Sequence, residues 1–262
     1  MPTPFTRRRK TMRIKAFLKS NLGFIIFLAV FGVIGGIFTG LWSLETISPE
    51  MLEESLAMVG SEGVLIFIGV VQVMFYSVFL GIVGKAIAER IGLWRDFSFD
   101  KKGALVTGIV MLVGGVMLIL PDVFIFSYFS EAVADSYLEK PTLNYIITAL
   151  TYGGVVEEVM MRLFLMSLVA LVISRFRADK DATSGVVLAS NIIVALVFAA
   201  GHLPATAMTT GITVPILIRC FLLNGGFGFV FGYLYQKYGI YYAMAAHAGV
   251  HLISKLIWII FI

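Results

Sequence analysis

The sequence is poor in charge, cysteine and histidine. Only 14% of its 262 residues are charged, whereas 59% are hydrophobic, and soluble domains carry roughly 25% charged residues. This composition excludes water-soluble domains, secreted scaffolds, disordered chains and nucleic-acid modules. The single cysteine, Cys220, lies in an apolar run, so no intrachain disulfide can form. No proline-rich linker, repeat or low-complexity tract divides the chain.

Long apolar runs are what the sequence has instead. Seven of them are long enough to cross a hydrocarbon core of about 30 Å; they cover residues 22–43, 63–84, 103–121, 143–174, 184–203, 212–235 and 240–261. The pattern predicts an all-α, polytopic integral membrane helical bundle with about seven transmembrane helices and a buried active site. We expect one continuous bundle, with a basic tail and three helices in residues 1–142 and four helices in 143–262.

The basic residues predict the orientation of the bundle. Most Lys and Arg residues fall in the tail and in every second connecting segment, namely Arg7, Arg8, Arg9, Lys10, Arg13, Lys15, Lys19, Lys85, Arg90, Arg95, Lys101, Lys102, Arg175, Arg177, Lys180 and Lys237. Because such residues concentrate on the cytoplasmic side, we expect a cytoplasmic N-terminus and an outside C-terminus in a prokaryotic plasma membrane. The first apolar run is too long for a signal peptide and is expected to be a retained anchor.

The other connecting segments are acidic. We expect solvated outer segments before the second and fourth spans, the latter holding Asp122, Glu131, Asp135 and Glu139, and a short interfacial helix at 49–59. Small-residue spacings at Gly32, Gly36 and Gly40 and at Gly228 and Gly232 would permit close helix packing, although glycine is common in such helices anyway.

Three ionisable residues lie together in the fourth span. An ionisable side chain at the bilayer centre costs at least about 2.5–3.5 kcal/mol, so each needs a partner or a function. Glu158 and Arg162 are an i,i+4 pair on one helical face and are expected to form an ion pair. Glu157 points in another direction, so it is predicted to be the free carboxylate and a candidate general base.

All three histidines lie within or at the edge of predicted spans. His202 ends the fifth span, and His247 and His251 are four residues apart in the seventh, where both can address one point. A lone membrane histidine is often structural, but three histidines and two acids on three helices favour a functional cluster.

Two chemistries fit this cluster. A carboxylate and a histidine can activate water while other donors stabilise the oxyanion of an amide tetrahedral intermediate. Alternatively, Glu157, His202, His247 and His251 could ligate Zn²⁺ and acidify a bound water. The motif His-Glu-x-x-His is absent, which favours the first chemistry. No cofactor is therefore the preferred expectation, with zinc as the alternative.

These residues resemble the CAAX protease and bacteriocin-processing family (CPBP, Abi) of intramembrane proteases, which includes CAAX prenyl endopeptidases. The family pattern is Glu-Glu-x-x-x-Arg, then Phe-x-x-x-His, then His-x-x-x-Asn or Asp, on successive helices. The sequence has Glu157-Glu-Val-Met-Met-Arg162, Phe198-Ala-Ala-Gly-His202 and His247-Ala-Gly-Val-His251. The resemblance covers about residues 143–255, so 143–262 is the expected catalytic core.

The resemblance implies an endopeptidase in which Glu157, with His202, activates the hydrolytic water. His247 and the residue at 251 would polarise the scissile carbonyl, and Arg162 would brace the site through Glu158. The departure is His251, where the family usually has Asn or Asp. A histidine can donate a hydrogen bond to an oxyanion only in a suitable tautomer or charge state, which also raises the plausibility of the metal alternative.

One geometric expectation conflicts with straight helices. Counted at 1.5 Å per residue, Glu157 and His247 lie near mid-membrane, whereas His202 lies near the outer end of its span. A tilt, a later start or a break at Pro204 would bring His202 to the others. Asn224 is a further candidate for the cavity; Ser190, Asn191, Arg219 and Lys255 are weaker ones, since Ser and Asn bridge helices and lysine snorkels.

The predicted function is therefore an intramembrane endopeptidase that acts on a membrane-associated, lipidated (CAAX-type) or transmembrane peptide or protein. A non-catalytic scaffold or immunity-type member is the alternative, and a proton-coupled carrier is a weaker one because no inverted repeat is present. The expected partners are membrane lipid and the substrate, with no nucleic acid. The sequence predicts no oligomeric state.

Overall fold

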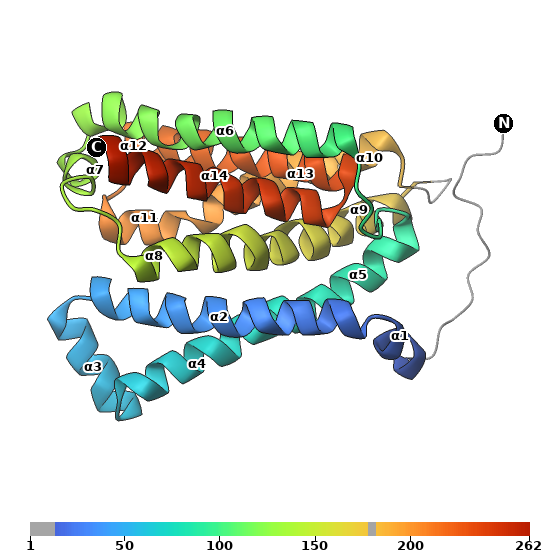
Figure 1. Cartoon of the computed structure of the whole chain (residues 1–262), viewed down its shortest axis with the longest axis horizontal. Helices are drawn as coiled ribbons and strands as arrows, with labels where there is room; N and C mark the ends of the chain where they lie inside the picture. Colours follow the sequence, from blue (N-terminus) through green and yellow to red (C-terminus); the bar gives the residue numbers. More distant parts are fainter. Residues whose placement is uncertain (1–13, 178–181) are drawn as a thin grey trace.

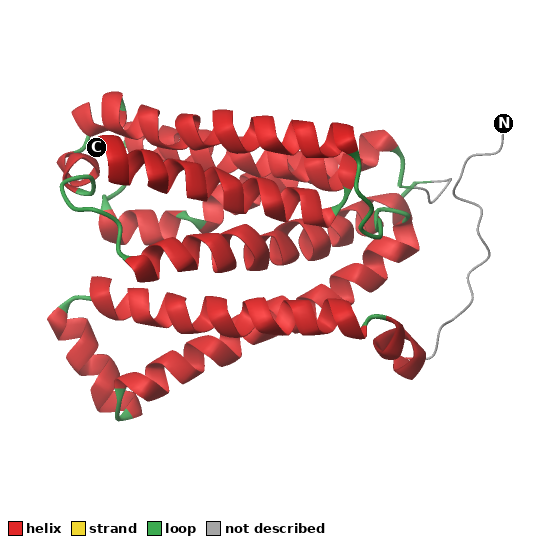
Figure 2. Ribbon diagram, in the orientation of Figure 1, coloured by secondary structure: helices red, strands yellow, loops and turns green. Residues whose placement is uncertain are grey.

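The protein is an all-helical bundle, described here from a computed structural model that covers residues 14–177 and 182–262. Within these ranges there is no strand (Figure 2). The basic residues Arg7, Arg8, Arg9, Lys10, Arg13 and Lys180 lie outside the described residues.

The helices follow one another with short connections. Their bounds are α1 (Ile14–Ser20), α2 (Leu22–Thr46), α3 (Pro49–Val59), α4 (Glu62–Met74), η1 (Phe75–Phe79), α5 (Leu80–Ile91), α6 (Lys101–Phe124), η2 (Phe126–Tyr128), α7 (Glu131–Asp135), α8 (Leu143–Thr148), η3 (Ala149–Glu157), η4 (Val159–Met166), α9 (Ser167–Arg175), α10 (Ser184–Gly201), α11 (Leu203–Thr209), α12 (Val214–Cys220), η5 (Phe221–Gly225), α13 (Gly226–Tyr238) and α14 (Ile240–Phe261). Of the η segments, η2 is a 3₁₀ turn and the other four are π-helical.

Six helices of the described chain qualify as membrane spans by length and composition alone. They are Leu22–Thr46, Glu62–Ile91, Lys101–Tyr128, Ser184–Thr209, Val214–Tyr238 and Ile240–Phe261, each at a predicted position. The remaining predicted span is a continuous helical run through α8, η3, η4 and α9, residues 143–175. It exceeds the ~20 residues that a crossing requires but carries Glu157, Glu158 and Arg162 in its middle. The predicted bundle is therefore confirmed, with about seven spans.

The bundle is organised around α14. This helix packs against α6, η3 and α13, while α10 packs against α13, η5 and η4. Helices α2 and α4 pair with each other, and α2 also packs along α8 and η3. Helix α4 runs obliquely from α3, apart from the other helices, and the chain returns to them through α5 (Figure 1). The start of α1 and the end of α14 lie at opposite ends of the bundle (Figure 1), as an odd number of crossings requires.

Glycines bring pairs of helices close together. A Cβ added to Gly36 would lie 2.6 Å from Val70 Cα, so α2 and α4 pack backbone to backbone there. A Cβ on Gly154 would lie 2.8 Å from Ala248 Cα, which shows the same for η3 and α14. The predicted close packing at Gly36 is thus confirmed.

The short helix at 49–59 is also confirmed. Ser48 caps α3 by accepting from the Met51 amide, and Gly60, with φ of 92°, ends it in the left-handed conformation. The division of the chain at residue 142 stays a prediction. The third span, α6, packs along α14 of the C-terminal part.

Candidate active site

The helical run 143–175 places two carboxylates and a guanidinium in the bundle interior. Most of the run is π-wound, a rare geometry that often accompanies functional sites. Glu158 and Arg162 are fully buried, with exposed side-chain fractions of 0% and 1%, and their Oε1 and Nη1 atoms are 2.9 Å apart. The expected ion pair is therefore present.

Arg162 contacts residues of α10 and α13. Its Nη2 donates to the Gly228 carbonyl oxygen at 3.0 Å, and its guanidinium lies over the rings of Phe198 and Phe231, 4.6 and 5.6 Å from the ring centroids. A Cβ on Gly228 would lie 3.2 Å from Arg162 Nη2. Gly228 is thus needed at this position for the arginine, and not only for helix packing.

His247 joins α14 to these acids. Its Nδ1 lies 2.8 Å from Glu158 Oε1, and its Nε2 lies 4.0 Å from Glu157 Oε2. The ring stacks on Phe231 and on His251, with centroids 4.4 and 5.0 Å away. Because Nδ1 donates to a carboxylate, the histidine is fixed in orientation and presents Nε2 toward Glu157.

Glu157 is the less constrained of the two acids. Its side chain is 19% exposed, and within the described residues its nearest basic group is His247 Nε2. A separation of 4.0 Å is too long for a direct hydrogen bond but fits a bridging water. Glu157 therefore faces the histidines without a direct ion pair to Arg162, as expected.

His251 faces the same space from the next turn of α14. An ideal Cβ on Gly153 would lie 3.3 Å from His251 Nε2 and 4.0 Å from His247 Nε2. The missing side chain of Gly153 leaves room where both imidazoles converge. The Nδ1 atom of His251 is buried and has no hydrogen-bond partner among the described residues.

His202 lies at a break in its span. Helix α10 ends at Gly201, and α11 starts at Leu203 with Pro204 in its first turn, where the ring removes a backbone donor. His202 Nδ1 lies 2.8 Å from the Phe198 carbonyl oxygen. The Phe198 ring lies edge-on to two histidine rings, with its centroid 4.6 Å from that of His202 and 6.3 Å from that of His247. The break thus turns His202 toward the cluster, although no hydrogen bond joins it to Glu157 in the described chain.

Asn224 lies one turn before Gly228. Its amide nitrogen donates to Cys220 Sγ at 3.5 Å, and Cys220 Sγ donates to the Ala199 carbonyl oxygen at 3.3 Å. Asn224 therefore adjoins the segment between Phe198 and His202 through Cys220. Its expected role in the cavity stays a prediction.

Two polar groups differ from the expectation. Asp122 was expected in a solvated outer segment, but it lies in α6 and is only 3% exposed. It accepts from Arg219 Nε at 2.7 Å and from the Tyr137 hydroxyl at 3.0 Å. Burial, and next the Asp122 carboxylate, raise the pKa of Tyr137, so this phenol stays a neutral donor. Lys255 does not snorkel into solvent: it is 6% exposed.

The donor set does not form a metal site. Among residues 14–177 and 182–262, no three His, Cys, Asp or Glu side chains are arranged to hold a metal ion. Of the four predicted ligands, His247 already uses Nδ1 on Glu158 Oε1 and has only Nε2 directed toward Glu157.

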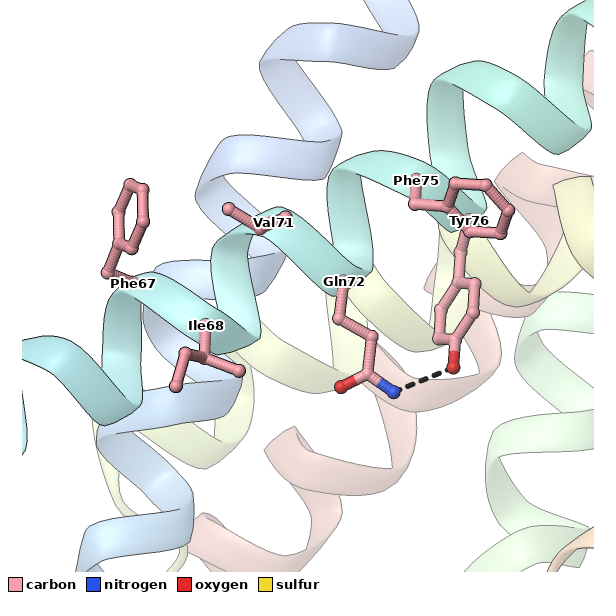
Figure 3. A pocket seen from close by; sticks show the side chains of 6 residues that line it. All are labelled: Phe67, Ile68, Val71, Gln72, Phe75 and Tyr76. Atoms are coloured by element: carbon pink, nitrogen blue, oxygen red, sulfur yellow. Dashed lines mark hydrogen bonds between the residues drawn. The ribbon is translucent and has the colours of Figure 1, made fainter. Parts of the chain in front are cut away.

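Two hollows lie along α4 and η1. The larger, about 620 Å³, follows one face of α4 and η1 (Figure 3) and is lined by Phe67, Ile68, Val71, Gln72, Phe75 and Tyr76. In it Gln72 Nε2 donates to the Tyr76 hydroxyl at 2.7 Å. The smaller, about 270 Å³, shares Gln72 and Tyr76 and extends to Tyr152, the neighbour of Gly153. An apolar surface thus leads from the lipid-facing side toward the helix of Glu157.

The fold and the site together define a polytopic membrane protein with a buried carboxylate–histidine cluster. Residues 139–253 match the model of the family described as Type II CAAX prenyl endopeptidase Rce1-like. This match supports a membrane protein of the CAAX protease family and confirms the resemblance seen in the motifs. No curated protein and no solved structure matches the chain.

Sequence reasoning missed several residues that shape the site. Phe231 stacks on His247, and nothing in the sequence distinguishes it from other phenylalanines of the span. Gly153 and Gly154 had a usable signal, because two adjacent small residues just before the acidic pair indicate a close approach. The pairing of Asp122 with Arg219 joins helices distant in sequence and has no local signal.

Proposed function

We propose that the protein is an intramembrane endopeptidase that hydrolyses a peptide bond of a lipidated, CAAX-type protein by means of a water activated by Glu157 and His202. The family is one of CAAX-type intramembrane endopeptidases. The observation that carries the proposal for this chain is the space between Glu157 Oε2 and His247 Nε2, whose 4.0 Å separation suits a water.

The hydrolytic water would lose its proton to this pair of bases. Glu157 pairs with no lysine or arginine in the described chain and contacts only His247 Nε2, at 4.0 Å, so its oxygen is available to the water. His202 donates from Nδ1 to the Phe198 carbonyl, and in that tautomer Nε2 carries a lone pair. The water oxygen adds to the scissile carbonyl carbon to give a tetrahedral intermediate. As this intermediate collapses, the C–N bond breaks, and the proton taken from the water is delivered to the nitrogen of the leaving amine.

The tetrahedral intermediate would be stabilised from α14. Glu158 holds His247 through Nδ1 and so aims Nε2 at the place of the developing oxyanion, where Nε2 would act as a donor once it carries a proton. The Nε2 of His251 faces the same space beside Gly153. Arg162 keeps Glu158 in place, so it supports the oxyanion donors indirectly.

The apolar hollow along α4 supports a lipidated substrate. Its lining is mostly aromatic and aliphatic, and its continuation reaches Tyr152, which precedes Gly153. A hydrocarbon chain of a substrate in the bilayer could lie there while its peptide reaches Glu157.

The variant Glu157→Gln tests the proposal. Because Glu157 pairs with no lysine or arginine in the described chain, the variant should fold as the wild type does. Its kcat/KM on a prenylated peptide should fall by about 10²–10⁴-fold, the usual contribution of a general base. Glu53→Gln removes an exposed carboxylate of α3 and should leave cleavage unchanged. Undiminished cleavage by folded Glu157→Gln would overturn the proposal, and no cleavage by folded wild type would favour the scaffold alternative.

A further inference from the structure

Lys255 is a buried cation that pairs with no carboxylate of the described residues. Three other deeply placed cations have one: Lys85 pairs with Glu89 at 2.7 Å, Arg162 with Glu158 at 2.9 Å, and Arg219 with Asp122. Lys255 is 6% exposed, and no carboxylate of residues 14–177 or 182–262 lies within ion-pair distance of it. An ammonium group buried within a membrane span is costly, so an unneutralised one points to a ligand.

The contacts of Lys255 leave its charge and most of its donors unused. Its Nζ donates one hydrogen bond, to the Tyr145 hydroxyl at 3.2 Å. It also lies 4.3 Å from the ring centroid of Tyr145 and 5.6 Å from that of Trp258. Aromatic faces attract a cation but do not neutralise it, and an ammonium group has three protons to donate.

The position of Lys255 connects it to the active site. Residues 247, 251 and 255 recur every four positions and therefore share one face of α14. Lys255 lies about 6 Å along the axis from His251 and about 12 Å from His247, at 1.5 Å per residue. Between them, His251 Nδ1 is buried and lacks a partner in the described chain. Two polar groups with unused hydrogen-bonding capacity, His251 Nδ1 and Lys255 Nζ, thus follow His247 along this face of α14.

We propose that Lys255, assisted by His251 Nδ1, binds the C-terminal carboxylate of the substrate. The inference rests on the proposed function. A C-a-a-X substrate has three residues after its modified cysteine, and three extended residues span about 10 Å. This length matches the distance from the histidine pair to Lys255. The site therefore selects a free C-terminus three residues beyond the scissile bond.

A comparison of two peptides tests the carboxylate site. The peptides carry a prenylated cysteine followed by three residues and end in either a free carboxylate or a carboxamide. Wild-type protein should cleave the acid with a kcat/KM at least about tenfold higher than the amide. In Lys255→Met the ratio should fall to about one, through loss on the acid alone. Lys255→Arg keeps the charge and should keep the preference.

Lys140→Met is the matched control. Lys140 is exposed and donates to the Trp258 carbonyl oxygen at 3.2 Å, so it lies at the same end of α14 outside the proposed site. This variant should retain the wild-type ratio. Equal cleavage of acid and amide by wild type, or an unchanged ratio in folded Lys255→Met, would overturn the proposal.

A binding measurement separates this proposal from the proposed function. Glu157→Gln protein in detergent should bind the acid peptide at least about tenfold more tightly than the amide, and the added change Lys255→Met should abolish the difference. If wild type cleaves neither peptide but the acid still binds preferentially, the endopeptidase function fails and the carboxylate site stands. Equal binding of both peptides contradicts the carboxylate site.

Discussion

Glu158 is the residue on which the interior charges converge. Its Oε1 atom lies 2.9 Å from Arg162 Nη1 and 2.8 Å from His247 Nδ1, while its Oε2 has no hydrogen-bond partner in the described chain. One carboxylate therefore both neutralises a buried arginine and orients a site histidine. The two neighbouring glutamates differ accordingly: Glu158 is committed to partners, and Glu157 is available.

Removing either member of the buried pair should destabilise the fold. Glu158→Gln leaves Arg162 buried and unpaired, and Arg162→Met leaves Glu158 buried and unpaired. Each variant should lower the free energy of unfolding by about 3–5 kcal/mol. Thermal unfolding and the yield of folded protein in detergent measure this loss. The double variant should lose less than the sum of the singles, because it strands no charge. Wild-type yield and melting temperature in both single variants would contradict the structural role of the pair.

The polar residues differ in how far the sequence predicts their contacts. The pair Glu158–Arg162 is predictable because its members are four residues apart on one helix. The pair Asp122–Arg219 is not, since it joins α6 to α12 and depends on how the helices assemble. Likewise the sequence predicts that Lys255 snorkels, whereas Tyr145 and Trp258 hold it inside.

At the scale of elements, the helical run 143–175 is distinguished by its π-winding. Hydrogen bonds of the i→i+5 type place more residues in each turn than the 3.6 of an α-helix. Helical periodicity identifies the span, but it cannot reveal this winding, because the same apolar residues fit either geometry. The break at His202 was easier to predict, since Pro204 supplies a local cause.

The close contact between η3 and α14 gives a prediction for this element. In Gly154→Ala the new Cβ would lie 2.6 Å from Ala248 Cβ, so the helices must separate. We expect a loss of about 1–3 kcal/mol from overpacking and lower cleavage activity, because Glu157, His247 and His251 lie on these two helices.

Gly108→Ala is the matched control for this prediction. Gly108 lies within α6, and its added Cβ meets nothing within 4 Å, so stability should be unchanged or slightly higher. Melting temperatures and cleavage rates of both variants, measured in the same detergent, provide the comparison. Equal behaviour of Gly154→Ala and Gly108→Ala would refute the tight contact.

At the scale of the molecule, the bundle surrounds a polar cluster with lipid-facing apolar helices. Span positions were predictable because hydrophobic length is a local property. The three motifs also predicted which residues gather in the interior. The sequence did not predict that α4 runs obliquely away from the other helices while α2 packs along α8 and η3 (Figure 1), since this depends on packing between distant segments.

The orientation in the membrane stays a prediction with a direct test. Seven crossings with basic residues inside place the N-terminus in the cytoplasm and the C-terminus outside. A reporter active only outside the membrane should therefore be active at Ile262 and inactive in the segment near Arg95. Activity of cytoplasmic reporters at both positions would indicate an even number of crossings between Arg95 and Ile262.

The central claim is that a carboxylate, and not a metal, activates the water. The most direct measurement combines the metal content of purified wild-type protein with its cleavage of a prenylated peptide, before and after exposure to a chelator. The account predicts cleavage without stoichiometric metal, unaffected by the chelator and lost in Glu157→Gln. Stoichiometric zinc together with chelator-sensitive cleavage would contradict it.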